Sequence, residues 1–159
     1  RWPGWRRGCR VPMGSPPGDR GRPLPEPSPL TEEFWSAAAR HELVRPVCSR
    51  CGRSHFTPQV ACPHCLATDW RYRPSTGRGT VYSHTVVHRP PGPGFDPPYV
   101  LAVVDLDEGW SMLTNVVGCD PHDVHIGQAV QARFDRVGDD VVLPVFAPAA
   151  DPQDNEEPA

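Results

Sequence analysis

Two cysteine pairs carry the clearest chemical signal in this sequence of 159 residues. Cys48 and Cys51 form one Cys-x-x-Cys pair, and Cys62 and Cys65 form a second pair ten residues later. Turns of this spacing let both thiolates reach one ion, so the pairs predict a tetrahedral Zn²⁺ site with four sulfur ligands. A four-sulfur iron site and disulfide bonds are the weaker alternatives. Because four protein ligands leave no open coordination position, we expect a structural and not a catalytic metal.

The other groups that could do chemistry are scattered. His84 and His88 lie on one face of a predicted strand, and Asp105, Asp107 and Glu108 lie where another strand meets its turn. Either group could transfer protons, but solvent-facing histidines and a hydrated hairpin end explain them as well. The sequence contains no glycine-rich phosphate loop and no nucleophile elbow. We therefore expect no autonomous active site.

A helix is predicted before the cysteines, over residues 30–44, with residues 30–46 forming an N-terminal helical unit that Pro46 ends. Thr31 suits the N-cap, and the acidic residues that follow it favour the first turn. The helix carries an apolar patch that either packs on the zinc module or contacts another subunit. The patch comprises Phe34, Trp35, Ala38 and Ala39.

Beyond Gly79 the pattern changes to short runs of β-forming residues. We expect five strands, with a short turn of helix over 120–127 between the third and the fourth, which is typical of an OB-type barrel. Pro144 lacks a backbone donor, so the last strand should lie at an edge or near the barrel closure. The predicted strands span residues 80–88, 99–107, 110–117, 129–137 and 141–146.

The segment from Arg89 to Pro98 is longer than a hairpin needs, and seven of its ten residues are Pro or Gly. Prolines stiffen an extended loop and lower the entropy cost of docking it. Phe95, near its middle, is a suitable anchor. We interpret this loop as a binding element on the barrel.

Charge and composition exclude several classes of protein. No apolar run approaches the length of a spanning helix, so we expect no membrane segment. The net charge of −3 gives no general attraction to nucleic acid. A single-stranded nucleic-acid-binding module remains the alternative, although the barrel region offers few basic residues. Cysteine spacing typical of a metal site and the lack of a secretory signal favour the reducing cytoplasm.

The ordered features together resemble the DUF35 family, over about residues 30 to 148. The resemblance includes the cysteine quartet, which many zinc ribbons share, but the other motifs make it more specific. These motifs are Phe34-Trp35, Gly79-Thr80-Val81-Tyr82-Ser83, Pro98-Tyr99-Val100, Leu106-Asp107-Glu108-Gly109, Val117-Gly118, Ile126-Gly127-Gln128-Ala129-Val130-Gln131 and Pro144-Val145-Phe146-Ala147-Pro148.

The resemblance implies a mainly β fold with an N-terminal helix, a rubredoxin-like zinc ribbon and a C-terminal five-stranded OB-fold barrel. The expected organisation is completed by two disordered segments, a Pro- and Gly-rich extension and an acidic tail. Zn²⁺ should supply the folding energy of the ribbon, because about 30 residues are too few for a core of their own. The expected units are the extension (1–29), the helix (30–46), the ribbon (47–75), the OB-fold (76–148) and the tail (149–159).

The resemblance also implies a function. DUF35 proteins are accessory subunits of thiolase-superfamily enzymes, and a similar domain, often fused to a MaoC-like hydratase subunit, binds a lipid-transfer-protein-like aldolase in steroid side-chain degradation. This implies a non-catalytic subunit of a heteromeric complex, a retro-aldolase (lyase) or an acyltransferase, whose acyl-CoA substrate is bound together with the partner. The expected contact residues for partner or acyl-CoA are Phe34, Trp35, Arg89, Phe95 and Tyr99.

Overall fold

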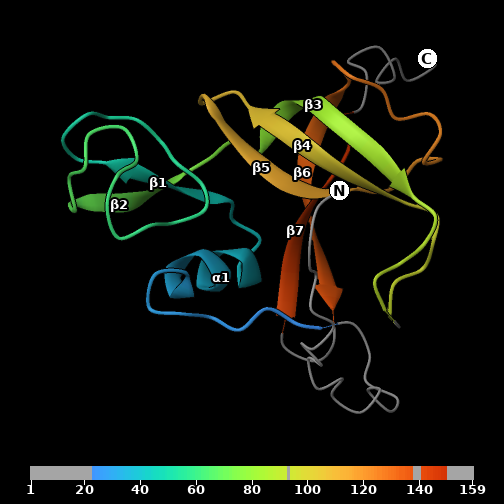
Figure 1. The fold of residues 1–159 in the computed structure, drawn as a ribbon, viewed down its shortest axis with the longest axis horizontal. Coiled ribbons are helices and arrows are strands. Elements are labelled where there is room, and N and C mark those ends of the chain that lie inside the picture. The colour runs from blue at the N-terminus through green and yellow to red at the C-terminus, as the bar shows by residue number, and fades with distance from the viewer. Residues whose placement is uncertain (1–22, 93, 138–140, 150–159) are drawn as a thin grey trace, which may run out of the picture.

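The computed structural model describes residues 23–92, 94–137 and 141–149. The described chain consists of a helix, a small sheet and a closed barrel (Figure 1). Helix α1 (Glu32–Ala39) precedes a two-stranded sheet made of β1 (Val44–Cys48) and β2 (Trp70–Pro74). The sheet and the loops around it lie beside a closed barrel, and α1 packs between them, against β7 and β1. Residues 1–22 of the predicted extension and 150–159 of the predicted acidic tail lie outside the described residues, whereas residues 23–29 are described and form no helix or strand.

Five strands close the barrel in the order β3-β4-β5-β7-β6, which confirms the predicted fold class. Every neighbouring pair is antiparallel except β5 with β7, which is parallel. Closure depends on two short contacts. Strand β7 meets β5 through a single parallel pair, Val116 with Phe146, and the start of β3 pairs with β6. Pro144 lies near the first contact, where its carbonyl accepts a hydrogen bond from Thr114 Oγ1 at 3.2 Å. The strands are β3 (Arg78–Val87), β4 (Tyr99–Leu106), β5 (Trp110–Val116), β6 (Ala129–Val137) and β7 (Val141–Pro148).

The barrel interior is apolar because alternate residues of each strand point inward. Strand β4 has the most regular pattern: Val100, Ala102, Val104 and Leu106 are buried, and the residues between them are partly exposed. Phe146 on β7 is fully buried and belongs to the same core. The barrel therefore has a core that does not depend on any ligand.

Gly79 lies where β3 pairs with β4 on one side and with β6 on the other. A Cβ atom at this position would overlap the backbone carbonyl of Asp105. Only glycine lets the strands approach this closely, so Gly79 is a structural requirement of the barrel closure.

The N-terminal helix is shorter than predicted, and the residues up to Pro46 do not continue it. Helix α1 ends at Ala39, and His41 takes a left-handed conformation with φ 62°. Val44 and Pro46 lie in β1 and pair with β2. The alternating burial of β1 defines this strand, and its pairing with residues more than twenty positions away overrides the local helical pattern.

The predicted helical turn over 120–127 is also wrong. Residues Pro121 to Asp123 form an isolated turn, in which Asp120 Oδ1 accepts a hydrogen bond from the backbone N–H of His122 at 2.9 Å. The chain then returns to the barrel, where Gly127 N–H donates to the Val81 carbonyl and Val81 N–H donates to the Gln128 carbonyl. These backbone bonds to β3 replace the bonds of a helix.

Candidate metal centre and contact surfaces

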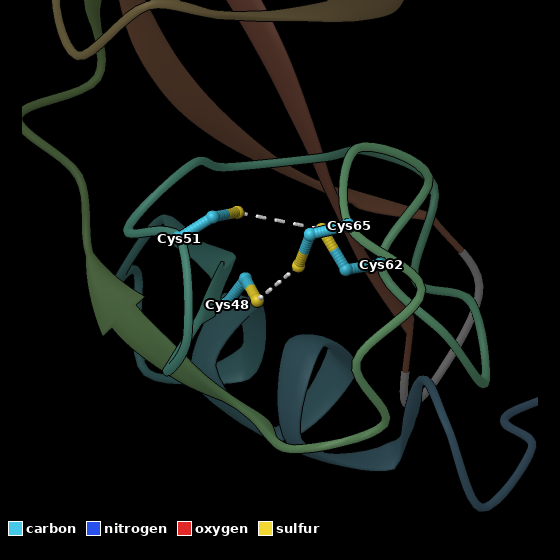
Figure 2. A group of neighbouring side chains, drawn as sticks. All are labelled: Cys48, Cys51, Cys62 and Cys65. Carbon is cyan, nitrogen blue, oxygen red and sulfur yellow. Dashed lines mark hydrogen bonds between the residues drawn. The ribbon is translucent and has the colours of Figure 1, made fainter.

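The four cysteines of the two pairs converge on one point in the ribbon (Figure 2). Each pair lies in a turn of the same kind, in which the N–H of the fourth residue after the first cysteine donates to its carbonyl at 2.9 Å. Gly52 and Leu66 follow the second cysteine of each turn and share a left-handed conformation, with φ of 71° and 60°. The matching turns explain how two separate segments present their thiols to the same point.

The sulfur geometry fits a tetrahedral metal. Cys48 Sγ lies 3.5 Å from Cys65 Sγ, and Cys51 Sγ lies 3.7 Å from Cys62 Sγ. Four thiolates about 2.3 Å from one ion would stand about 3.8 Å apart. The observed spacing is far longer than the bond of about 2.05 Å in a disulfide. Among the residues that the structure describes, these four form the only group able to hold a metal.

The electrostatics of the cluster also call for a cation. The backbone N–H of Cys51, which donates to the Cys48 thiol, lowers the pKa of Cys48 to about 7. The N–H of Ala67 has the same effect on Cys65, but burial and the neighbouring thiols outweigh it and raise the pKa of Cys65 to about 11. Two thiolates 3.5 Å apart repel each other, so both can ionise only when a positive ion lies between them.

Three aromatic side chains join the helix, the ribbon and the barrel. The ring of Phe56, from the ribbon, lies 5.3 Å from that of Phe34 on α1 and 5.3 Å from that of Trp110 on β5. Phe34 and Trp110 are both buried in the common core. Phe34 therefore packs against the ribbon, which is one of the two alternatives for the apolar patch, and it also lies in the lining of the groove described below.

Glu108 forms a second junction between ribbon and barrel. Its carboxylate accepts hydrogen bonds from Ser75 Oγ at 2.9 Å and from the backbone N–H of Thr76 at 2.6 Å. Burial alone would raise the pKa of Glu108, but the hydrogen bonds from Thr76 and Ser75 outweigh it, so the pKa lies below its ordinary value. The carboxylate holds the chain that links β2 to β3 against the β4–β5 turn.

The neighbouring acids and histidines do not form a catalytic set. Asp105 accepts a hydrogen bond from Ser111, and Asp107 pairs with Arg78 at 3.8 Å. His84 lies opposite Ala102, on the inward side of β3, and His88 lies beyond the end of that strand. The two carboxylates are thus held by their neighbours, and the ring of His88 lies 6.0 Å from that of His122.

An apolar groove of about 310 Å³ lies between α1, the loop after Phe56 and the barrel. Trp35 lines it and is half-buried, and Leu113 on β5 lies in its wall with 63% of its surface exposed. Sequence reasoning identified Trp35 but missed Phe56 and Leu113. The alternation along β5 could have singled out Leu113 as an apolar residue on the outside of the barrel.

The remaining predicted contact residues lie elsewhere. Phe95 stacks on Tyr99, with ring centroids 5.9 Å apart, and Arg89 is exposed on the same loop. This loop joins the ends of β3 and β4 that are remote from the ribbon linker, and it projects on the side of the barrel opposite the ribbon (Figure 1). The structure thus separates the five predicted residues into two surfaces.

None of the helices in the described part of the chain is long and apolar enough to cross a membrane.

Comparison with known families gives the class of protein. The family described as "ChsH2, rubredoxin-like zinc ribbon domain" matches residues 35–71, and "ChsH2, C-terminal OB-fold domain" matches residues 72–135. A DUF35 domain-containing scaffold protein from Methanocaldococcus jannaschii is 37% identical over 110 residues, which cover 65% of this chain and 77% of that protein. The chain belongs to the DUF35/ChsH2 family, as its motifs predict.

Two further relatives, which are named as hydratase alpha subunits, are much longer proteins. A probable enoyl-CoA hydratase alpha subunit from Thermomonospora curvata is 41% identical over 117 residues, 73% of this chain. The 3-oxo-4,17-pregnadiene-20-carboxyl-CoA hydratase alpha subunit of Mycobacterium tuberculosis is 37% identical over 111 residues, 69% of this chain. The match spans 37% and 35% of these two proteins.

Among solved structures, a chain of an "Ltp2-ChsH2(DUF35) aldolase" superposes with a TM-score of 0.73 at 37% identity. The match covers 79% of this chain and 98% of that chain. A DUF35 protein of unknown function from Sulfolobus solfataricus has a TM-score of 0.52 at 20% identity and shares the fold.

Proposed function

We propose that this chain is a non-catalytic scaffold subunit that binds a thiolase-like protein of the Ltp2 type and supports its cleavage of a CoA thioester. The observation that carries this proposal is the similarity to the DUF35 chain of the Ltp2–ChsH2 aldolase, which is matched over 98% of its length.

The proposed cofactor is one structural Zn²⁺ held by Cys48, Cys51, Cys62 and Cys65. Zn²⁺ would supply positive charge and a cross-link between the two turns, with no position left for a substrate. The thiolates would then hold the ribbon in the conformation that places Phe56 against Phe34 and Trp110. The role of the metal is to fix one of the surfaces that the partner meets.

Two surfaces are proposed to contact the partner or its substrate. The first is the groove at Trp35 and Leu113, since exposed apolar area next to a rigid helix favours association. The second is the stiff loop of Arg89 and Phe95 with Tyr99, at the other side of the barrel. A CoA thioester of a steroid side chain is the proposed substrate class, because one relative is named for a pregnadiene carboxyl-CoA.

Co-expression with the Ltp2-type protein of the same genome tests the proposal. We expect the two chains to co-elute in size-exclusion chromatography, at an apparent mass that corresponds to a complex of defined stoichiometry. Trp35→Ala and Phe95→Ala should each weaken the complex, and Leu24→Ala, at an exposed site before the helix, serves as the control. Separate elution of the two wild-type chains at micromolar concentration would refute the proposal.

A further inference from the structure

One side of the ribbon's two-stranded sheet carries a group of arginines. The register places Arg45 of β1 opposite Arg73 of β2, and Val47 opposite Arg71. Residues directly opposite one another in an antiparallel pair project from the same side, with Cβ atoms about 5 Å apart. We call these four residues the arginine face. Three guanidinium groups therefore project from one small surface, and Val47 lies between them.

Within the described residues, no ion pair joins Arg45, Arg71 or Arg73 to a carboxylate. Like charges directly opposite each other destabilise a sheet, and a nearby anion would relieve this cost. Three other arginines on the described surface do have such partners. The ion pairs are Arg40 with Glu42, Arg78 with Asp107 and Arg133 with Asp135.

Arg45 shows the same deficit at the level of single atoms. Its Nη1 donates to Ser54 Oγ, a neutral acceptor, at 2.9 Å. Its Nε is buried and has no hydrogen-bond partner among the described residues. A buried guanidinium donor without an acceptor costs free energy, and a carboxylate that pairs with the accessible part of the guanidinium group would offset the cost of its buried positive charge.

The surroundings distinguish between kinds of anion. Trp70 and Tyr72 alternate with the arginines of β2, so their rings lie on the opposite side of the sheet, where they pack on each other. The arginine face thus has no aromatic platform on which a base could stack. It combines guanidinium groups with an apolar centre, which is a composition favoured in protein–protein interfaces.

The charge of the ribbon contrasts with that of the rest of the chain. Residues 44–74 contain five arginines and one aspartate, whereas residues 76–148 contain four arginines and nine acidic residues. A hollow of about 300 Å³ beside the arginine face is lined by Val47, Arg71 and Arg73 together with Cys48 and Ser49. The positive charge is therefore local, and it is arranged around a depression that a side chain could enter.

We propose that the arginine face docks onto an acidic surface of the partner protein, where carboxylates pair with Arg45, Arg71 and Arg73. The identity of that partner as an Ltp2-type protein rests on the proposed function. Planar guanidinium groups bind carboxylates in bidentate fashion, and strands hold them in a fixed arrangement that favours one orientation of the partner. The contact would also steer the two proteins together and make their association depend on salt.

The test compares charge reversals within the ribbon. Arg71 and Arg73 are exposed, so R71E/R73E should fold as the wild type does and keep its metal content. We expect the affinity for the Ltp2-type protein, measured by isothermal titration calorimetry, to fall about thirtyfold or more and to lose most of its salt dependence. R71Q/R73Q, which removes charge without reversing it, should show a smaller loss in the same direction.

R53E is the matched control, because Arg53 is exposed on the ribbon but contacts His64 of the second turn. It should change the affinity less than about threefold. Equal binding by wild type and R71E/R73E overturns the arginine-face proposal and leaves the scaffold function intact. No binding by the wild type overturns both. Retention of a single-stranded oligonucleotide that R71E/R73E abolishes would assign the arginine face to phosphate and overturn the proposal.

Discussion

The ribbon and the barrel of this chain are held together by different forces. The barrel buries a continuous set of apolar side chains from all five strands, with Phe146 fully enclosed. In the ribbon the residues buried between the two cysteine turns are cysteines and His55, which contacts the edge of Trp70. The comparison teaches that a module of about 30 residues, which lacks a core of its own, needs a further source of stability, and the proposed metal and the neighbouring barrel would supply it.

Removal of the proposed metal should have the largest effect, because the metal would supply the folding free energy of the ribbon. The barrel, which has its own core, should not respond. Chelation, or Cys62→Ser, should unfold residues 44–74, with a loss of up to about 10 kcal/mol of metal-binding free energy. Hydrogen exchange should show loss of protection in β1 and β2 and retained protection in β4 and β5. Cys119→Ser, at a cysteine outside the cluster, is the control. Simultaneous unfolding of both regions would show that they form one cooperative unit.

A substitution at a closely packed glycine of the barrel should have the opposite effect and destabilise the barrel more than the ribbon. Gly79→Ala places a Cβ against the Asp105 carbonyl, which should lower the free energy of unfolding of the barrel by about 3 kcal/mol. Urea unfolding followed by barrel tryptophan fluorescence measures the change. Gly92→Ala, at a site with no atom within 4 Å of the added Cβ, should be neutral. Equal midpoints for the two variants would contradict the assigned role of Gly79.

The junction between the regions should respond to pH. Because the folded pKa of Glu108 is lowered, its contribution is complete above the ordinary pKa of 4.5 and is lost as the pH falls through the lowered folded value. Glu108→Gln should therefore destabilise the chain by about 1 kcal/mol near pH 7, and the difference from wild type should shrink below pH 4. Thermal unfolding at several pH values measures this difference. A constant difference, or a similar effect of the exposed-site variant Glu26→Gln, would contradict the prediction.

The smallest expected effect on stability comes from the residue that follows the second cysteine in each turn. Leu66 adopts the left-handed conformation that Gly52 adopts in the first turn. Leu66→Gly should relieve this strain and stabilise the metal-loaded ribbon by about 0.5 kcal/mol, whereas Gly52→Ala should cost about 1 kcal/mol. The melting temperature of the metal-loaded chain measures both changes. If both substitutions changed the melting temperature by the same amount and in the same direction, the left-handed residue would not have the same role in the two turns.

The barrel strands and the four-cysteine cluster could be predicted because their signals are local. Alternation along residues 99–106 and the spacing of the cysteines are both visible within a few residues. Strand β1 could not be predicted in the same way. Its pairing partner, β2, lies more than twenty residues away, and Pro46 resembles a helix stop when only its neighbours are considered.

The contacts between regions were also beyond the reach of sequence reasoning. Glu108 reads as one of several acids in a hairpin turn, and its role depends on Ser75 and Thr76, which lie more than 30 residues earlier. The sequence left open whether the patch of Phe34 packs on the ribbon or meets a partner, and in the structure its ring lies 5.3 Å from that of Phe56. An apolar residue on a short helix is equally suited to a core and to an interface, and only the packing of the whole chain decides between them.

Reconstitution of activity tests the central claim most directly. The chain and the Ltp2-type protein of the same genome are purified separately and assayed, alone and mixed, for cleavage of a steroid side-chain CoA thioester. The scaffold account predicts no turnover by this chain, little by the partner, and full activity on mixing in proportion to the complex formed. Turnover by the isolated chain, or a partner that is equally active without it, would contradict the account.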